Sequence, residues 1–343
     1  MMSKKVLITG GAGYIGAHTV DALAKSGYTP IIVDDFRNSN PRVIQDLSKL
    51  IGFEPLFYTI DICDKSALKD VFKTHQINSV IHFAAFKAVG ESVIEPLKYY
   101  QNNLIGLLNI LECMEAFDVN ELVFSSSCTV YGEPDSIKEV TEETPKQLPT
   151  SPYGYTKWMA EQIISDYAKA NSRFKVICLR YFNPIGAHPS GLIGELPIGK
   201  PNNLLPFITQ TAIGKHSKLL VFGNDYPTID GTCIRDYIHV MDLADAHIKA
   251  VEAFGNNSIA SCEYINVGTG KGTSVLQMIQ AFEEISGAKL SWEFAPRRTG
   301  DIIEIYANVD RAKSLLNWQA QFSYQDAIKD AWNWELSNKQ KEH

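Results

Sequence analysis

Two side chains with complementary acid–base chemistry, Tyr153 and Lys157, stand four residues apart in the run YGYTK. On a helix this spacing places both on one face. A phenol has an ordinary pKa of about 10, too high for a base at neutral pH, but a nearby positive charge favours the phenolate. Upstream, Ser125–Ser127 offer hydroxyls that could bond the same substrate oxygen. These groups together suit removal of a proton and a hydride from a secondary alcohol.

A glycine-rich run at residues 9–16, TGGAGYIG, indicates the hydride acceptor and follows the apolar residues 6–8. Such glycines let the chain turn tightly, and the following helix points free N–H groups at a pyrophosphate. Asp34 ends the next apolar run, 18 residues after Gly16, where a carboxylate bonds the ribose hydroxyls of a dinucleotide. Because Asp34 and Asp35 together would repel a 2′-phosphate, the prediction is NAD rather than NADP.

Both motifs also have ordinary structural interpretations. The Tyr153 and Lys157 pair could be a packed aromatic residue beside a solvated lysine. The glycine run could be a strand–turn–helix connection with a capping aspartate. The presence of both motifs in one chain favours the chemical interpretation of each, because function is argued from an assembled site.

Strands and helices alternate through the first half of the sequence. The predicted strands are residues 6–8, 31–33, 56–59, 80–83, 122–125 and 176–180, and the predicted helices include 42–50, 65–75, 99–117 and 153–170. This alternation predicts an α/β protein with a Rossmann-type, doubly wound parallel sheet. In such a sheet, ligands bind beyond the carboxyl ends of the strands.

The pattern loosens after residue 180. Prolines and glycines interrupt residues 184–201, and so long an irregular stretch in a compact protein is usually functional. We therefore expect a NAD-binding domain over residues 1–180 and a smaller α/β substrate domain over 181–343. Some segments of the second half are expected to return to the main sheet.

The composition is that of a globular enzyme. The 343 residues are 45% hydrophobic, and the formal net charge of −7 comes without a basic stripe, which argues against a nucleic-acid partner. No apolar run reaches about 18 residues, so no membrane span is expected. Six scattered cysteines without metal-type spacing predict buried thiols of a cytoplasmic protein and no metal site.

The motifs resemble those of the extended short-chain dehydrogenase/reductase family, and further blocks are similar to the UDP-glucose 4-epimerases within it. These blocks are HFAAFKAVGES at residues 82–92, SSSCTVYG at 125–132, RYFNPIGAHPSG at 180–191, PNNLLPF at 201–207, FGNDYPTIDGTCIRDYIHVMDLADAH at 222–247 and APRRTGD at 295–301. The resemblance implies interconversion of UDP-galactose and UDP-glucose through a transient 4-keto sugar and tightly bound NAD. It also implies a homodimer, formed through helices that include residues 99–117 and 153–170.

The resemblance also assigns individual residues. Ser127, Tyr153 and Lys157 match the catalytic trio. The residues implied to bind the cofactor are Gly10, Gly13, Tyr14, Ile15, Asp34, Asn38, Ser39, Asp61, Ile62, Phe83, Ala84, Lys87, Asn102, Ser125, Tyr153, Lys157 and Tyr181. Those implied to bind the sugar nucleotide are Lys87, Ser127, Tyr153, Phe182, Asn183, Asn203, Leu204, Phe222, Arg235, Arg298, Asp301 and Ile305. Arg235 and Arg298 also make chemical sense, because a planar guanidinium binds phosphate oxygens through two donors.

Dehydratases and decarboxylases of the same family carry acidic residues just after the serine strand, where this chain has Ser127, Cys128 and Thr129. Without a carboxyl group there, a 4-keto sugar has one easy route, which is to take the hydride back. Two alternatives remain. A non-catalytic NAD-binding sensor would share the fold. An epimerase for UDP-GlcNAc and UDP-GalNAc would need space in the hexose pocket, which the resemblance places at Ile305, unless that residue belongs to the core.

Overall fold

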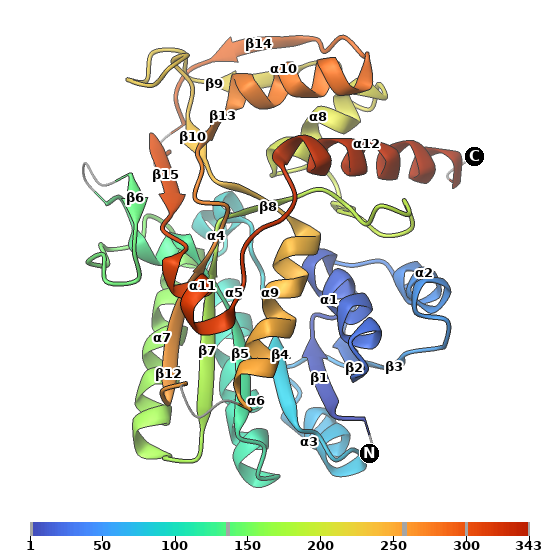
Figure 1. Ribbon diagram of the computed structural model, residues 1–343, viewed down its shortest axis with the longest axis vertical. Helices are drawn as coiled ribbons and strands as arrows, with labels where there is room; N and C mark the ends of the chain where they lie inside the picture. Colours follow the sequence, from blue (N-terminus) through green and yellow to red (C-terminus); the bar gives the residue numbers. More distant parts are fainter. Residues whose placement is uncertain (1–2, 135–137, 256–258, 299–300, 342–343) are drawn as a thin grey trace.

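The computed structural model describes residues 3–134, 138–255, 259–298 and 301–341. A seven-stranded parallel sheet with the order β12-β7-β5-β4-β1-β2-β3 forms its larger part (Figure 1). The strands are β1 (Lys5–Thr9), β2 (Thr29–Asp34), β3 (Leu56–Thr59), β4 (Ser79–His82), β5 (Glu121–Ser127), β7 (Lys175–Tyr181) and β12 (Cys262–Val267). The predicted doubly wound sheet is confirmed, and its strand order reverses between β1 and β4.

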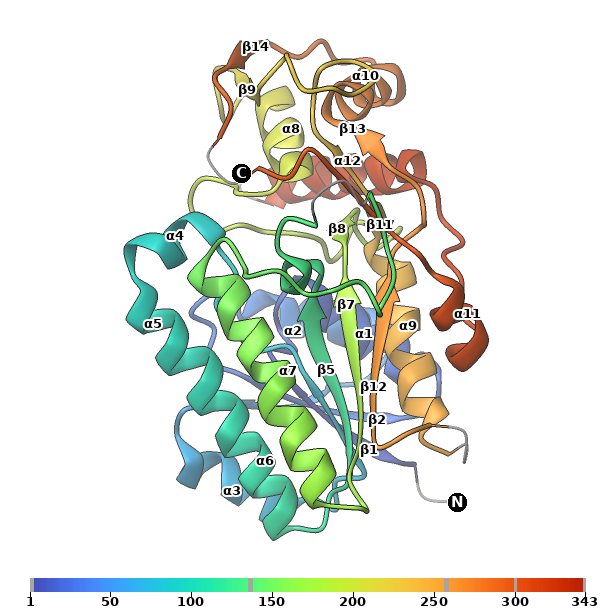
Figure 2. The same ribbon diagram turned by 90° about the vertical axis from the view of Figure 1, so that its left-hand side faces the viewer.

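Helices cover both faces of this sheet (Figure 2). One face packs against α1 (Tyr14–Lys25), α2 (Arg42–Ile51), α9 (Val240–Ala253) and α11 (Asp310–Leu316). The other packs against α3 (Lys65–Thr74), α6 (Gly106–Ala116) and α7 (Pro152–Ala170). Side chains of β1 alternate between the two cores, since Val6 and Ile8 belong to the first and Leu7 to the second. This alternation is the period of two that a strand buried on both faces requires.

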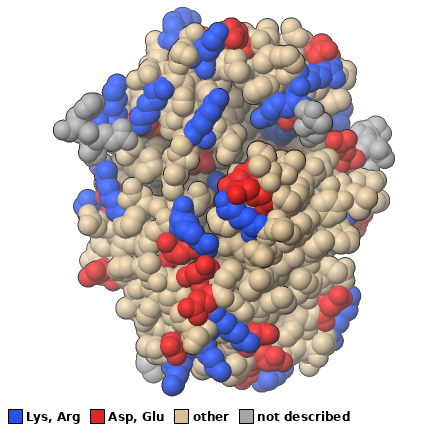
Figure 3. Space-filling model, turned by 180° about the vertical axis from the view of Figure 1, so that it is seen from behind, with Lys and Arg blue, Asp and Glu red and all other residues tan. Residues whose placement is uncertain are grey.

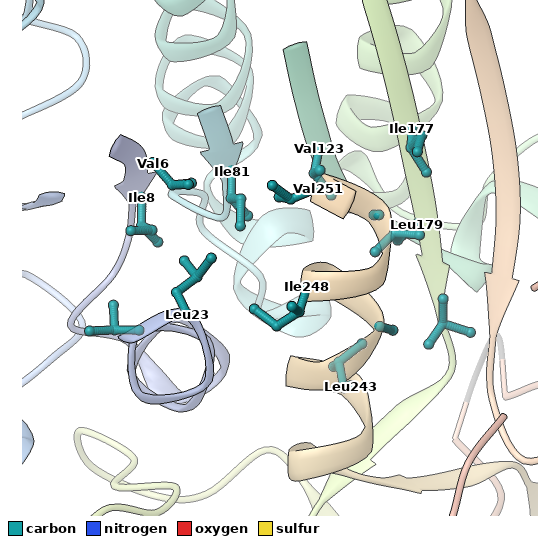
Figure 4. Close-up of a cluster of buried hydrophobic side chains, with 14 of the residues drawn as sticks. Val6, Ile8, Leu23, Ile81, Val123, Ile177, Leu179, Leu243, Ile248 and Val251 are labelled. Carbon is teal, nitrogen blue, oxygen red and sulfur yellow. The ribbon is translucent and has the colours of Figure 1, made fainter. Parts of the chain in front are cut away.

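The first of these cores joins the two halves of the sequence. Figure 4 shows Leu243, Ile248 and Val251 of α9 pointing toward the strand residues Ile81 and Leu179. All five side chains are at most 4% exposed. Segments that follow residue 180 therefore complete the layers around the main sheet, as α9 on its face and as β12 beside β7.

A smaller lobe lies beyond the carboxyl ends of the main strands (Figure 1). Its helices are α8 (Leu204–Ala212), α10 (Val275–Ser286) and α12 (Tyr324–Lys341). The pair β9 (Leu219–Phe222) and β14 (Trp292–Ala295) lies beside them, and β8 (Asn183–Ile185) pairs with β11 (Tyr237–His239). A four-stranded sheet has the order β13 (Thr273–Ser274), β10 (Ile234–Arg235), β15 (Glu304–Ala307) and β6 (Glu139–Val140).

The helix predicted over residues 99–117 differs from the observed segment. The chain runs through α4 (Val89–Ile94) and α5 (Pro96–Tyr100), and a π-helix, η1 (Gln101–Ile105), separates α5 from α6. Both Asn102 and Asn103 are buried within η1. Asn103 Nδ2 donates to the carbonyl of Phe86 and to Thr156 Oγ1, at 3.0 Å each. The wider turn thus lets two consecutive polar side chains face the protein, which a regular helix does not favour.

Three further features of the described residues concern membrane spans, cysteines and surface charge. In this part of the chain, no helix is both long and apolar enough to cross a membrane. All six cysteines are described and free. On the face in Figure 3, acidic and basic side chains lie close together across the lower half.

Candidate active site

The glycine-rich loop packs against the residues that follow β4. Gly10 has a φ of +69°, and a Cβ there would lie 2.8 Å from the backbone nitrogen of Ala84. A Cβ on Gly16 would lie 2.2 Å from the carbonyl oxygen of Gly10. The helix α1 begins at Tyr14, directly after this loop, with Gly13 as its N-cap. The loop therefore brings bare backbone to the strand-order reversal, the geometry that a dinucleotide pyrophosphate needs.

Asp34 is fixed at the carboxyl end of β2. Its Oδ2 accepts from the backbone N–H of Ala12 at 3.0 Å, and its Oδ1 accepts from the N–H of Phe36 at 2.9 Å and from Ser39 Oγ at 2.8 Å. Burial raises the pKa of Asp34, and these hydrogen bonds oppose the rise. The carboxylate is thus oriented beside the glycine loop, where the ribose hydroxyls of NAD would be bound.

Asp35 is arranged differently from what the sequence suggested. Arg37 Nε donates to Asp35 Oδ2 at 2.6 Å, and the backbone N–H of Arg37 donates to Asp35 Oδ1 at 2.9 Å. An arginine therefore offsets the charge of Asp35. The sequence suggested that Asp34 and Asp35 would both repel a 2′-phosphate. With the charge of Asp35 offset, only Asp34 is left to do so.

Tyr153 and Lys157 lie in the first turns of α7, beside the carboxyl end of β5. The helix begins as predicted, because Ser151 Oγ accepts from the N–H of Gly154 at 3.2 Å and Pro152 is its first residue. Lys157 is buried, and its Nζ donates to the carbonyl of Ser125 at 2.5 Å. Burial lowers the pKa of Lys157 to about 8, while Glu161 one turn further along acts in the opposite direction.

The pKa of Tyr153 also departs from the sequence-based expectation. Burial raises it to about 12, against the influence of a hydrogen bond with Ser127. Lys157 directs its ammonium at the Ser125 carbonyl, and the pKa of Tyr153 is raised rather than lowered as the sequence suggested. The chain alone therefore holds Tyr153 in its neutral form at pH 7, and ionisation requires a further positive charge nearby.

A buried network behind the trio was not found from the sequence. Glu161 accepts from Ser126 Oγ at 2.5 Å and from Arg180 Nη2 at 2.9 Å, and it also pairs with Lys146. Arg180 and Glu161 are at most 1% exposed. The network ties β5 and β7 to α7. One signal for it exists in the sequence, since Glu161 stands four residues after Lys157 and shares its helix face.

The other predicted cofactor residues all lie at the same edge. Gly10 and Gly13 follow β1, Tyr14 and Ile15 open α1, Asn38 and Ser39 follow β2, Asp61 and Ile62 follow β3, Phe83, Ala84 and Lys87 follow β4, Asn102 lies in η1, Ser125 lies near the end of β5, and Tyr181 ends β7. Tyr181 Oη and His247 Nε2 are hydrogen-bonded at 2.5 Å. The His247 ring centroid lies 4.7 Å from that of Phe83, so His247 is a further residue of this edge that the sequence did not reveal.

The predicted sugar-nucleotide residues are supplied mainly by the smaller lobe. Arg298 forms an ion pair with Asp301 at 3.1 Å and lies 4.7 Å above the Phe222 ring. Arg235 and Ile305 are register partners on β10 and β15. The remaining members are Phe182, which follows β7, Asn183, which starts β8, and Asn203 and Leu204 at the start of α8.

Ile305 is 2% exposed and belongs to a buried cluster with Phe182, Tyr131 and Val130. Its role in a hexose pocket stays a prediction. A separate contact joins the two lobes, because Glu195 accepts from Asn203 Nδ2 at 2.6 Å and lies 3.4 Å from Lys87 Nζ. Glu195 thus connects two predicted ligand-binding side chains, and the sequence motifs gave no sign of this link.

Comparisons with known proteins agree with this geometry. The model of the NAD dependent epimerase/dehydratase family matches residues 6–268. A UDP-glucose 4-epimerase of Yersinia enterocolitica is 51% identical over 333 residues, 97% of this chain and 98% of that protein. UDP-glucose 4-epimerase 2 of Arabidopsis thaliana is 49% identical over 98% of this chain and 96% of its own length. The crystal structure of the Bifidobacterium longum UDP-glucose 4-epimerase with NAD+ and UDP superposes with a TM-score of 0.94 at 41% identity, covering 98% and 99% of the two chains.

The close packing of the glycine loop predicts the effect of a single methyl group. Gly16→Ala would place a Cβ 2.2 Å from Gly10 O and 2.8 Å from Gly11 Cα, both backbone atoms of the loop. Overpacking of this kind costs about 1–3 kcal/mol. We expect a lower melting temperature and less NAD retained on purification, measured by thermal unfolding and by mass spectrometry of the denatured protein.

Gly90→Ala is the matched control, because a Cβ on Gly90 meets no atom within 4 Å and the residue lies in α4. Its stability should be unchanged or slightly higher, since alanine favours a helix over glycine. Equal behaviour of the two variants would contradict the packing argument.

Proposed function

We propose that this chain, which belongs to the NAD dependent epimerase/dehydratase family, interconverts UDP-galactose and UDP-glucose through a transient 4-keto sugar. The single observation that carries the proposal is the placement of Tyr153, Lys157 and Ser127 beside the glycine loop at one sheet edge. This activity would make the protein an isomerase of nucleotide-sugar and galactose metabolism. The same placement supports an enzyme over a non-catalytic sensor, which would not need the three residues together.

The residues present fit NAD. The glycine loop admits a close approach to backbone, and Asp34 is held in place to accept from ribose hydroxyls. When bound, NAD supplies a reversible hydride acceptor at its nicotinamide ring. The B. longum relative was crystallised with NAD+ and UDP, which supports the same pair of ligands here.

Tyr153 is the proposed proton carrier. It takes the proton of the 4-hydroxyl and returns a proton to the oxygen at C4 when the epimer forms. Its pKa of about 12 must fall for this role, and a cationic ring beside the phenol would lower it. Ser127, which is hydrogen-bonded to Tyr153, is placed to bond the same substrate oxygen, and Lys157 adds positive charge from the helix turn below.

The proposed anchor of the substrate is its UDP part. Arg235 and Arg298 supply guanidinium groups for the diphosphate, and Asn203, Leu204, Phe222 and Asp301 surround them in the smaller lobe. The hexose is held more loosely, because the 4-keto sugar must turn its other face before the hydride returns. Because the UDP part is the anchor, the substrate can stay bound while its hexose turns.

We also propose a homodimer, in the cytoplasm, formed through the helices on the α6 and α7 side of the sheet. Its support is an exposed apolar surface on this side, where Ile94 is 82%, Leu97 72%, Ile105 44% and Leu108 44% exposed. Twofold-symmetric dimers are the commonest soluble assemblies. Apolar side chains exposed at this level on adjacent helical segments are typical of a surface that a partner covers.

Sedimentation at micromolar concentration tests the assembly. The wild-type chain should sediment as a dimer, and the double substitution Ile105→Glu and Leu108→Glu should give monomers, because charges buried at an interface remain unpaired. Ile229→Glu is the control, since Ile229 is 82% exposed outside this surface. A monomeric wild type, or a dimer that tolerates both glutamates, would refute the proposed interface.

Tyr153→Phe tests the reaction itself. The change removes one hydroxyl and little volume, so the fold and bound NAD should remain. Conversion of UDP-galactose to UDP-glucose without added NAD should slow by roughly 10²-fold or more, the scale of a lost general acid–base group. Tyr155→Phe, two residues further along α7, is the control and should keep its turnover. The proposal fails if wild type shows no conversion, or if folded Tyr153→Phe turns over like wild type.

Ile305 tests the alternative substrates. If it limits the hexose pocket, UDP-glucose and UDP-galactose should be good substrates and UDP-GlcNAc and UDP-GalNAc slow ones. Ile305→Tyr should then abolish the N-acetyl activity and spare the plain hexoses, because overfilling a site costs about 1–3 kcal/mol. Ile305→Ala removes bulk from the same place and should favour the N-acetyl pair. Comparing kcat/KM for both pairs decides the matter. Equal losses on both pairs would instead make Ile305 a core residue.

A further inference from the structure

Arg37, three residues beyond Asp34, joins loops that follow different strands. Besides its two bonds to Asp35, its Nη2 lies 3.1 Å from Asp61 Oδ2 and donates to Asn102 Oδ1 at 3.2 Å. Asp61 follows β3, and Asn102 belongs to η1. One guanidinium therefore connects the loop after β2, the loop after β3 and the π-helix.

The aromatic ring of Phe86 lies against the same guanidinium. Arg37 Cζ is 5.4 Å from the Phe86 ring centroid, and Lys98 Nζ is 4.9 Å from it. Phe86 is fixed by two bonds to the Asn103 side chain, one through its N–H at 2.9 Å and one through its carbonyl at 3.0 Å. Arg37, Phe86, Lys98 and Asn102 border an open hollow of about 530 Å³.

These contacts gather at one end of the proposed cofactor site. Asp34 and Asp61 are expected at the adenosine half of the dinucleotide, and Asn102 is expected to face the cofactor. Arg37 contacts Asp61 and Asn102 directly. A single exposed ion pair contributes little to stability. A planar fork that binds two carboxylates and an amide at once is different, because one side chain then fixes three segments.

We propose that Arg37 is a positioning residue that clasps the loops after β2 and β3 to η1 and so slows the release of NAD. This inference rests on the proposed function, because NAD is the group retained. The contacts depend on the planar shape of the guanidinium as well as on its charge. Lysine carries the same charge on a single nitrogen and cannot reproduce all of them.

Exchange of bound NAD for isotopically labelled NAD measures the rate of NAD release, which Arg37 is proposed to slow. The holoenzyme is mixed with excess labelled NAD, and the bound fraction is followed by mass spectrometry. Arg37→Met should exchange about tenfold faster or more, since three contacts of a charged fork are lost together. Arg37→Lys should exchange NAD nearly as fast as Arg37→Met. Arg173→Met, which removes a surface ion pair with Asp118 at 2.8 Å, should exchange like wild type.

A double-mutant cycle separates a clasp from general loss of stability. Asp35→Asn should also speed exchange, because Asp35 holds Arg37 in place through two hydrogen bonds and an ion pair. The double variant should be no faster than Arg37→Met alone, since groups that act as one unit are not additive. Two independent losses of stability would instead multiply.

The outcomes separate this inference from the proposed function. Wild-type protein purified without NAD would overturn both. With NAD present, a wild-type exchange rate for Arg37→Met overturns the clasp alone. Arg37→Lys at the wild-type rate would assign the effect to charge rather than to the fork, and multiplicative effects in the cycle would assign it to stability. Either result overturns the clasp.

Discussion

The buried ammonium of Lys157 is the constraint on which the active-site edge depends. Burial lowers its pKa to about 8, so the charge survives at neutral pH by a narrow margin. The Ser125 carbonyl and the negative charge of Glu161 maintain it. Glu161 in turn needs Arg180 and Lys146, because an unpaired buried carboxylate is costly. One functional charge thus requires a chain of buried partners across β5, β7 and α7.

This arrangement decides how Tyr153 can work. A phenol with a pKa of about 12 is neutral at pH 7 and cannot take a proton. Positive charge brought close to it shifts the balance, and in a buried site that shift is larger than in water. In the proposed reaction, the tyrosine therefore becomes a base only when the site is assembled around it. Such coupling would restrict the proposed proton transfer to the complete complex of chain, cofactor and substrate.

Local features of the sequence predicted much of the fold and part of the site. The alternating apolar runs gave the six predicted strands of the main sheet, and Ser151 and Pro152 marked the start of α7. Other features depend on how individual side chains pack and bond, and could not be derived. The π-helix exists because Asn102 and Asn103 both face inward, and the pairing of Asp35 with Arg37 depends on side-chain geometry. Apart from β12, the strands after residue 180 have only two to four residues each, so periodicity identifies them poorly.

The two lobes divide the demands of the proposed reaction. Charged forks and amides, such as Arg235, Arg298 and Asn203, belong to the lobe expected to anchor the nucleotide, where directional bonds favour one fixed pose. Phe182 and Ile305, which are predicted to line the hexose pocket, are apolar, and an apolar wall gives no hydroxyl a preferred direction. A sugar beside such a wall can present either face to the acid–base trio while its diphosphate stays bound. Tight binding and sugar rotation then conflict little, because different groups of the chain are responsible for each.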